Sequence, residues 1–276
     1  AGFSIFPHGI ESLNHNAPFL MITGLLIFVG ELGFITLHEL FIYVRSCFTR
    51  GKSRISLHSK IVLSCTFFLL TISTLLLFIT EYNNTLQSST VLHKICNTLF
   101  NAISLKSCGF ITTPLTLMVY PTVFLIMIIT FIGSSPNSTG SGIKITSFAL
   151  LLATIRSVIT GRTVIEMRGR RIPHDQIFKV FAVFTLALLC IGITTFILLI
   201  TEQNHSFIAI LFESCSAFAN LGISLDVTHA LSFIGKIVII VNMIIGRIGA
   251  LTMILAIKKH KETTEFQYPE ERIMLS

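Results

Sequence analysis

Several long blocks of the sequence contain no charged residue, and this feature limits the possible fold more than any other. No charge occurs between Lys60 and Glu81, and none occurs between Lys179 and Glu202. A helix needs about 20 predominantly apolar residues to cross the hydrocarbon core of a bilayer, and each of these blocks meets that length. Charged residues make up 12% of the chain, whereas soluble domains carry about 25%. The blocks therefore predict an all-α integral membrane protein.

Apolar blocks and shorter mixed segments alternate along the chain. The blocks cover residues 17–44, 61–80, 117–156, 180–201 and 233–257. The third block is too long for one spanning helix, and a glycine- and serine-rich run interrupts it. The mixed segments are too short and too polar to span a bilayer, which needs about 20 apolar residues. We therefore expect the continuous blocks to form single helices and the third block to form a broken one.

Basic residues cluster in alternate connections between the blocks. They lie at 45–60, 156–171 and 258–261, whereas the connections at 81–94 and 202–207 hold almost none. Lys and Arg accumulate in cytoplasmic loops, so we expect the three basic segments and the C-terminus to be cytoplasmic. The net charge of +7 therefore does not indicate nucleic-acid binding, and no aromatic platforms accompany the basic residues. The six cysteines have no metal or redox spacing.

The order of segments repeats along the chain. A block, a short segment ending near a glycine, and a second block occupy 60–158 and again 177–260. Residues 1–46 match the second half of such a unit, and 261–276 form a polar tail. Because both flanking connections are basic, each short segment must enter and leave the membrane on the outer side. We expect helix, re-entrant pore loop, helix units around a pore, with two full repeats and the second half of a preceding one.

A glycine-containing turn closes each short segment, and such turns suit a cation path. A desolvated cation needs a ring of oxygens, which backbone carbonyls supply where glycine lets the chain turn. The C-terminus of a short helix adds partial negative charge at the same place. A lone glycine is more often only a turn, but here three stand in equivalent positions. The candidate filter residues are Ala1, Gly2, Phe3, Ser107, Cys108, Gly109, Phe110, Asn220, Leu221, Gly222 and Ile223.

The run that interrupts the third block has two interpretations. Glycine- and serine-rich stretches serve as flexible linkers. Against a linker, apolar sequence flanks the run and the basic connection begins only at Arg156. That places the break near membrane depth, where a broken helix lines a cavity. The run comprises Gly133, Ser134, Ser135, Pro136, Asn137, Ser138, Thr139, Gly140, Ser141 and Gly142, and Lys144 closes it as either an interfacial anchor or a gate contact.

Glu31 and Arg247 are ionisable residues that lie well inside apolar blocks. Arg247 either extends to the interface along its flexible chain or faces the interior, where its charge would be a barrier to cations. Glu31 is either a carboxylate paired with a neighbouring donor, or a cavity carboxylate that attracts cations or pairs with Arg247. Because ionisable residues inside membranes usually face the interior, we favour the barrier for Arg247. Both interpretations of Glu31 stay open.

The residues resemble the membrane subunit of the Trk/Ktr/HKT superfamily of potassium transporters. The similarity includes the candidate filter glycines and the interrupted run at 131–144. It also includes GRRIP at 169–173, IGRIG at 245–249 and YPEERI at 268–273. These matches extend along essentially the whole chain. The family has four repeats, so the resemblance implies a truncated chain, and Glu31 departs from the glycine expected at its position.

The resemblance implies potassium uptake through a filter of backbone carbonyls, with the run at 133–142, Lys144 and Arg247 forming an intramembrane gate. It further implies a bacterial inner-membrane homodimer that binds a cytoplasmic ring of nucleotide-sensing regulatory subunits. No cofactor is expected in this chain, potassium is the transported ion, and sodium co-transport stays open. No nucleophile–base constellation or phosphate loop points to an enzyme. The alternative is a polytopic permease for another cation or small solute.

Overall fold

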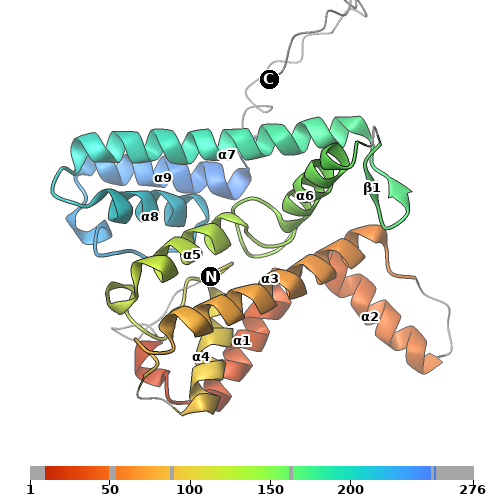
Figure 1. The fold of residues 1–276 in the computed structure, drawn as a ribbon, viewed down its shortest axis with the longest axis horizontal. Coiled ribbons are helices and arrows are strands. Elements are labelled where there is room, and N and C mark those ends of the chain that lie inside the picture. Colours follow the sequence, from red (N-terminus) through yellow and green to blue (C-terminus); the bar gives the residue numbers. More distant parts are fainter. Residues whose placement is uncertain (1–9, 50–53, 88–89, 162–163, 250–251, 253–276) are drawn as a thin grey trace, which may run out of the picture.

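A computed structural model describes residues 10–49, 54–87, 90–161, 164–249 and 252, and it is almost entirely helical there (Figure 1). The α-helices are α1 (Ala17–Glu31), α2 (Phe34–Thr49), α3 (Leu57–Glu81), α4 (Val91–Ser104), α5 (Tyr120–Phe131), α6 (Ile145–Ile159), α7 (His174–Thr201), α8 (Phe207–Phe218) and α9 (Phe233–Ile248). Three 3₁₀ turns are η1 (Glu11–Leu13), η2 (Leu115–Leu117) and η3 (Thr228–Ala230). Strands β1 (Glu166–Met167) and β2 (Arg170–Arg171) form a small antiparallel hairpin.

Two groups of helices lie on either side of α5 and α6 in Figure 1. Helices α7, α8 and α9 pack against one another, and α4 packs against both α1 and α3. Helix α5 contacts α3 and α8, while α6 contacts α3 and α7. The broken helix therefore joins the two groups.

Helices α3 and α7 are long and apolar enough to cross a membrane. Their outward faces carry large exposed apolar side chains, including Phe67, Phe68 and Phe196. A contiguous apolar exterior of this kind marks a membrane-contacting surface rather than a soluble one. The all-α membrane class predicted from the charge-free blocks is confirmed.

The prediction of one continuous helix over residues 17–44 is wrong. Helix α1 ends at Glu31, α2 begins at Phe34, and the two axes differ by 105°. Gly33 lies between them with φ +79°, a left-handed conformation that ends a right-handed helix and that glycine adopts at little cost. The sharp bend therefore has a specific backbone cause.

Serine residues begin three of the helices. Ser56, Ser206 and Ser232 precede α3, α8 and α9, and each side-chain oxygen accepts a hydrogen bond from the N–H three residues later. Such caps satisfy amides that have no partner within the helix, and each stabilises its helix by about 1 kcal/mol. The starting points of α8 and α9 are thus fixed by local serine caps.

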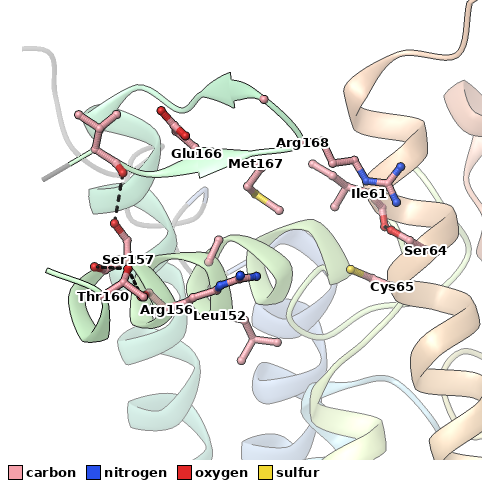
Figure 2. A pocket seen from close by; sticks show the side chains of 13 residues that line it. Ile61, Ser64, Cys65, Leu152, Arg156, Ser157, Thr160, Glu166, Met167 and Arg168 are labelled. Atoms are coloured by element: carbon pink, nitrogen blue, oxygen red, sulfur yellow. Dashed lines mark hydrogen bonds between the residues drawn. The ribbon is translucent and has the colours of Figure 1, made fainter. Parts of the chain in front are cut away.

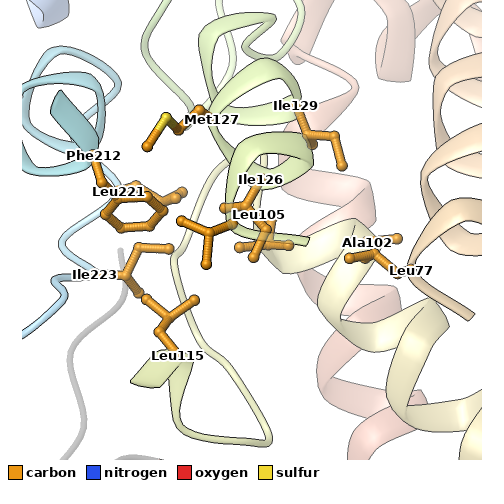
Figure 3. Packing of buried hydrophobic residues seen from close by; sticks show 11 residues of the cluster. Leu77, Ala102, Leu105, Leu115, Ile126, Met127, Ile129, Phe212, Leu221 and Ile223 are labelled. Atoms are coloured by element: carbon orange, nitrogen blue, oxygen red, sulfur yellow. The ribbon is translucent and has the colours of Figure 1, made fainter. Parts of the chain in front are cut away.

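The main apolar core lies where α3, α4, α5 and α8 meet. Figure 3 shows Leu105 and Ile126 near Phe212, Leu221 and Ile223, so residues from both short segments share one cluster. Leu105 directly follows α4, and Leu221 and Ile223 flank Gly222. The core therefore places the ends of the two short segments next to each other.

Gly246 of α9 lies directly against the carbonyl of Phe218 at the end of α8. A Cβ at this position would overlap that backbone oxygen, so Gly246→Ala should lower the free energy of unfolding by about 2–3 kcal/mol. Gly192 of α7 has nothing within 4 Å of the equivalent position. Gly192→Ala should therefore be neutral or stabilising by up to ~1 kcal/mol. Thermal unfolding in detergent measures both variants, and equal effects would contradict the packing argument.

Candidate functional site

The first candidate filter turn follows α4 directly. The Ser104 carbonyl accepts hydrogen bonds from the N–H groups of Ser107, Cys108 and Gly109, at 3.1, 2.9 and 3.0 Å. Gly109 has φ +71°, which lets the chain turn away from the helix without Cβ strain. The turn is therefore held on the C-terminal end of α4, the negative end of the helix dipole.

The second candidate filter turn follows α8 in the same manner. The Leu221 N–H donates to the Ser216 carbonyl at 2.9 Å. Asn220 and Gly222 have φ values of +52° and +81°. Positive φ is uncommon outside glycine, and asparagine is among the residues that tolerate it best. Both short helices thus end in left-handed turns.

The two turns meet in space. Gly109 lies against the backbone carbonyl of Leu221, so closely that a Cβ at position 109 would overlap it. Ser107, Cys108, Leu221 and Ile223 are all buried. Phe110 is half-buried, and Ala1, Gly2 and Phe3 lie outside the described residues. The fold therefore brings together the predicted residues of two turns.

Polar side chains on the two short helices hydrogen-bond to the chain segments that follow the turns. Sequence reasoning missed these side chains. The Asn101 amide oxygen accepts from the Thr112 N–H at 3.1 Å, and the Glu213 carboxylate accepts from the Thr228 hydroxyl at 2.6 Å. Asn101 and Glu213 occupy the same position of the parallel runs at 99–104 and 211–216. A polar residue at equivalent positions of two apolar helices was the available signal.

The interrupting run folds into a compact loop between α5 and α6. The Ile143 N–H donates to the Phe131 carbonyl at 3.2 Å, and Ile132 and Ile143 form an isolated bridge. Gly133 packs against the Ser141 carbonyl without room for a side chain. Ser134, Ser135 and Ser141 are buried. The run is thus an ordered loop whose ends are closed, and the flexible-linker interpretation does not describe it.

This loop docks into the break between α1 and α2. Ser135 donates to the Glu31 carbonyl through its N–H at 3.3 Å and its hydroxyl at 2.8 Å. The Thr139 N–H donates to the Gly30 carbonyl, and the Phe34 N–H donates to the Asn137 carbonyl, at 3.3 and 3.2 Å. These bonds satisfy backbone groups that the two helix ends leave without intrahelical partners.

Two cationic side chains bind the loop from the other side. Arg247 of α9 donates from Nη1 to the Thr139 carbonyl at 2.5 Å and to the Ser141 hydroxyl at 3.3 Å. Lys144 donates from Nζ to the Gly140 carbonyl at 2.8 Å. The predicted gate residues are therefore neighbours in space, although Arg247 stands more than 100 positions from the loop in the sequence.

Glu31 pairs with Lys106, and not with Arg247. Its Oε1 lies 3.3 Å from Lys106 Nζ, and both side chains are 1% exposed. The interpretation of Glu31 as a buried carboxylate with a neighbouring donor is the one that fits. Sequence reasoning missed Lys106, because a single lysine in a short mixed segment carries no signal of burial.

A cavity of about 480 Å³ lies away from these elements, between α3, α6 and the β-hairpin (Figure 2). Arg156, Arg168 and Glu166 line it together with Cys65 and Met167. None of the candidate filter or gate residues contributes to it. Within the described residues no three His, Cys, Asp or Glu side chains gather as a metal site. The candidate filter and gate residues therefore lie outside this cavity.

These elements define a class of helical membrane protein in which two glycine turns at the ends of short helices meet beside an ordered loop that breaks a helix. Residues 1–268 match the family described as TrkH, cation transport protein. The chain belongs to this family of cation transport proteins.

Three known proteins illustrate the similarity. The potassium/sodium uptake protein NtpJ of Enterococcus hirae is 32% identical over 100% of this chain and 61% of its own length. The Ktr system potassium uptake protein B of Bacillus subtilis is 32% identical over 99% of this chain and 60% of its own. The potassium transporter TrkH from Vibrio parahaemolyticus has the same fold, with a TM-score of 0.75, 19% identity, and coverage of 93% of this chain and 55% of that one. This chain thus spans about three fifths of the length of the curated relatives that it matches.

Gly33 provides a test of how the loop is docked. A Cβ at position 33 would lie 2.5 Å from both the Pro136 carbonyl and the Ser135 hydroxyl. Gly33→Ala should therefore displace the loop and cost clearly more than the ~1–2 kcal/mol of left-handed strain alone. Gly169→Ala is the matched control, because Gly169 has φ +74° and open space around it. Thermal unfolding and protease sensitivity of the loop compare the two, and equal destabilisation would show that only backbone strain is involved.

Proposed function

We propose that this protein takes up potassium through a pore whose selectivity filter is made of backbone carbonyls. The observation that carries the proposal is the meeting of two left-handed glycine turns, Gly109 and Gly222, at the C-terminal ends of α4 and α8. Helix C-termini stabilise a cation, and carbonyl oxygens replace its hydration shell without a charged side chain. The names of the similar uptake proteins support potassium as the ion.

We propose that the loop at 133–142 gates this path together with Lys144 and Arg247. The loop lies next to the first turn, since a Cβ at Gly140 would lie 3.0 Å from the Lys106 carbonyl. A positive guanidinium beside a cation path raises the electrostatic barrier to the ion. Opening would require the bonds from Arg247 to Thr139 and Ser141 to break.

A permease for another cation or small solute is the second candidate. Such a protein would use convergent polar side chains at the midplane, whereas the two turns here bring backbone together, with Gly109 against the Leu221 carbonyl. Sodium coupling belongs to the same question, because one relative is named a potassium/sodium uptake protein. Uptake measured with and without external sodium distinguishes these possibilities.

We further propose a bacterial inner-membrane homodimer with a cytoplasmic C-terminus and a cytoplasmic ring of nucleotide-binding regulatory subunits. Basic connections such as Arg168 to Arg171 support this orientation, because Lys and Arg concentrate in cytoplasmic loops. The tail at 261–276 lies outside the described residues. Native mass spectrometry of the full-length protein, purified with and without its genomic neighbours, tests both assemblies.

Gly222→Ser should lower the preference for potassium over sodium at least about tenfold, which corresponds to ~1.4 kcal/mol. Serine at this left-handed position strains the backbone, and the turn relieves that strain by moving its carbonyls. Rubidium uptake by the full-length protein in an uptake-deficient bacterium measures the effect.

Gly161→Ser is the matched control for the filter test. Gly161 has φ +67° and nothing within 4 Å of a built Cβ, as is true of Gly222 with φ +81°. The two substitutions carry the same backbone strain and differ only in location. Unchanged selectivity in Gly222→Ser, or equal loss in both variants, would remove the filter assignment.

Arg247→Gln should raise the unstimulated flux several-fold, because the loop loses a charge-assisted bond of ~1.5–3 kcal/mol. Deletion of 133–142 should raise it further. Arg156→Gln is the control, since Arg156 lines the separate cavity near α3. A flux in Arg247→Gln that equals the wild-type flux would exclude the gating role.

A further inference from the structure

Glu31 and Lys106 form an ion pair that is shielded from solvent between α1 and the first glycine turn. The atoms Oε1 and Nζ are 3.3 Å apart, and each side chain is 1% exposed. The pair of Lys179 with Asp175 contrasts with it, because both of those side chains are about two-thirds exposed. Burying two charges costs several kcal/mol per ion, which their attraction barely repays. Stability alone therefore does not explain the pair.

Within the described part of the chain, no other side chain forms an ion pair or hydrogen bond with these two charged groups. Both carboxylate oxygens of Glu31 and the ammonium of Lys106 lack a hydrogen-bond partner among the described residues. Among the described residues, the charge balance of this site thus depends on Glu31 and Lys106. Removal of either one leaves a full, buried and uncompensated charge.

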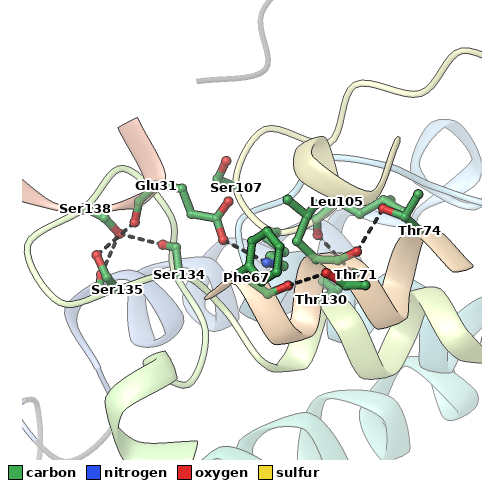
Figure 4. Close-up of polar contacts among 12 residues, drawn as sticks. Glu31, Phe67, Thr71, Thr74, Leu105, Ser107, Thr130, Ser134, Ser135 and Ser138 are labelled. Atoms are coloured by element: carbon green, nitrogen blue, oxygen red, sulfur yellow. Dashed lines mark hydrogen bonds and ion pairs between the residues drawn. The ribbon is translucent and has the colours of Figure 1, made fainter. Parts of the chain in front are cut away.

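The pair lies between the glycine turn and the interrupting loop. Lys106 directly precedes Ser107, and its carbonyl faces Gly140 of the loop. The Glu31 carbonyl accepts both hydrogen bonds of Ser135. Figure 4 shows Glu31 with Ser107 on one side and Ser134, Ser135 and Ser138 on the other. Lys106 is thus one residue from the candidate filter turn and next to the loop that we propose as the gate.

We propose that Glu31 is a specificity-determining residue that neutralises Lys106 beside the ion path. This inference rests on the proposed function and deepens it. A lone buried ammonium here would repel a potassium ion over several ångströms of low-dielectric protein. A lone carboxylate would hold any small cation, sodium included. The ion pair connects α1 to the turn through Lys106. Because the two charges cancel, the pair adds no net charge to the ion path next to the turn.

The test uses rubidium uptake by the full-length protein with three variants. Glu31→Gln should raise the half-saturating rubidium concentration on the order of tenfold, because it exposes the ion to the Lys106 charge. Lys106→Met should shift it in the opposite direction and lower the potassium-over-sodium preference several-fold. The double variant Glu31→Gln with Lys106→Met removes both charges and should return to within about twofold of wild type, since neutrality is restored.

A merely structural pair would behave differently. All three variants would then weaken uptake in the same direction, and the double variant would be no better than either single one. That result would overturn the inference. So would a Glu31→Gln variant with unchanged affinity and selectivity.

Folding is monitored by thermal unfolding of each purified variant. Where a single variant fails to fold, the charge-exchanged variant Glu31→Lys with Lys106→Glu replaces it, because it keeps both charges and the zero sum. Wild-type affinity in that variant supports neutralisation, and a folded but inactive one overturns it. Absence of rubidium uptake by the wild-type protein would instead refute the proposed function.

Discussion

Backbone hydrogen bonds between two helix breaks hold this structure together. The α1–α2 break and the loop between α5 and α6 each leave amides and carbonyls without helical partners, and each supplies the partners of the other. In a membrane such groups cost several kcal/mol when unpaired, because no water reaches them. Neither break would be tolerated alone. Their pairing places the loop beside the first glycine turn and within reach of Arg247.

Glycine makes the close backbone contacts of the site feasible. Gly109 lies on the Leu221 carbonyl, Gly133 on the Ser141 carbonyl, and Gly246 on the Phe218 carbonyl. In each case a Cβ would occupy the position of a backbone oxygen. These contacts bring α8 against α9 and one glycine turn against the other. Glycine at these positions therefore permits carbonyl positions that any larger residue would block.

The candidate site was predictable in its parts but not in its arrangement. Glycine spacing identified Gly109 and Gly222, and the interrupted run identified the loop. The break at Gly33 was missed, although Gly30, Glu31 and Gly33 stand close together in the block at 17–44, because no proline or longer polar run marks it. Gly33 lies close against Ser135 and Pro136, about 100 positions away, and the sequence does not show that contact. Lys106 was missed for a similar reason, since only its contact with Glu31 shows that it is buried.

The sequence by itself determined the membrane class, the order of long and short helices and their repetition. Those properties follow from local block length, charge placement and the position of glycines, which act over a single helix or turn. Only the tertiary structure decided that the two turns meet, that Arg247 binds Thr139, and that Glu31 pairs with Lys106. Each of these contacts joins residues from different helices. Such contacts depend on how the helices pack against one another, and a local sequence pattern does not contain that information.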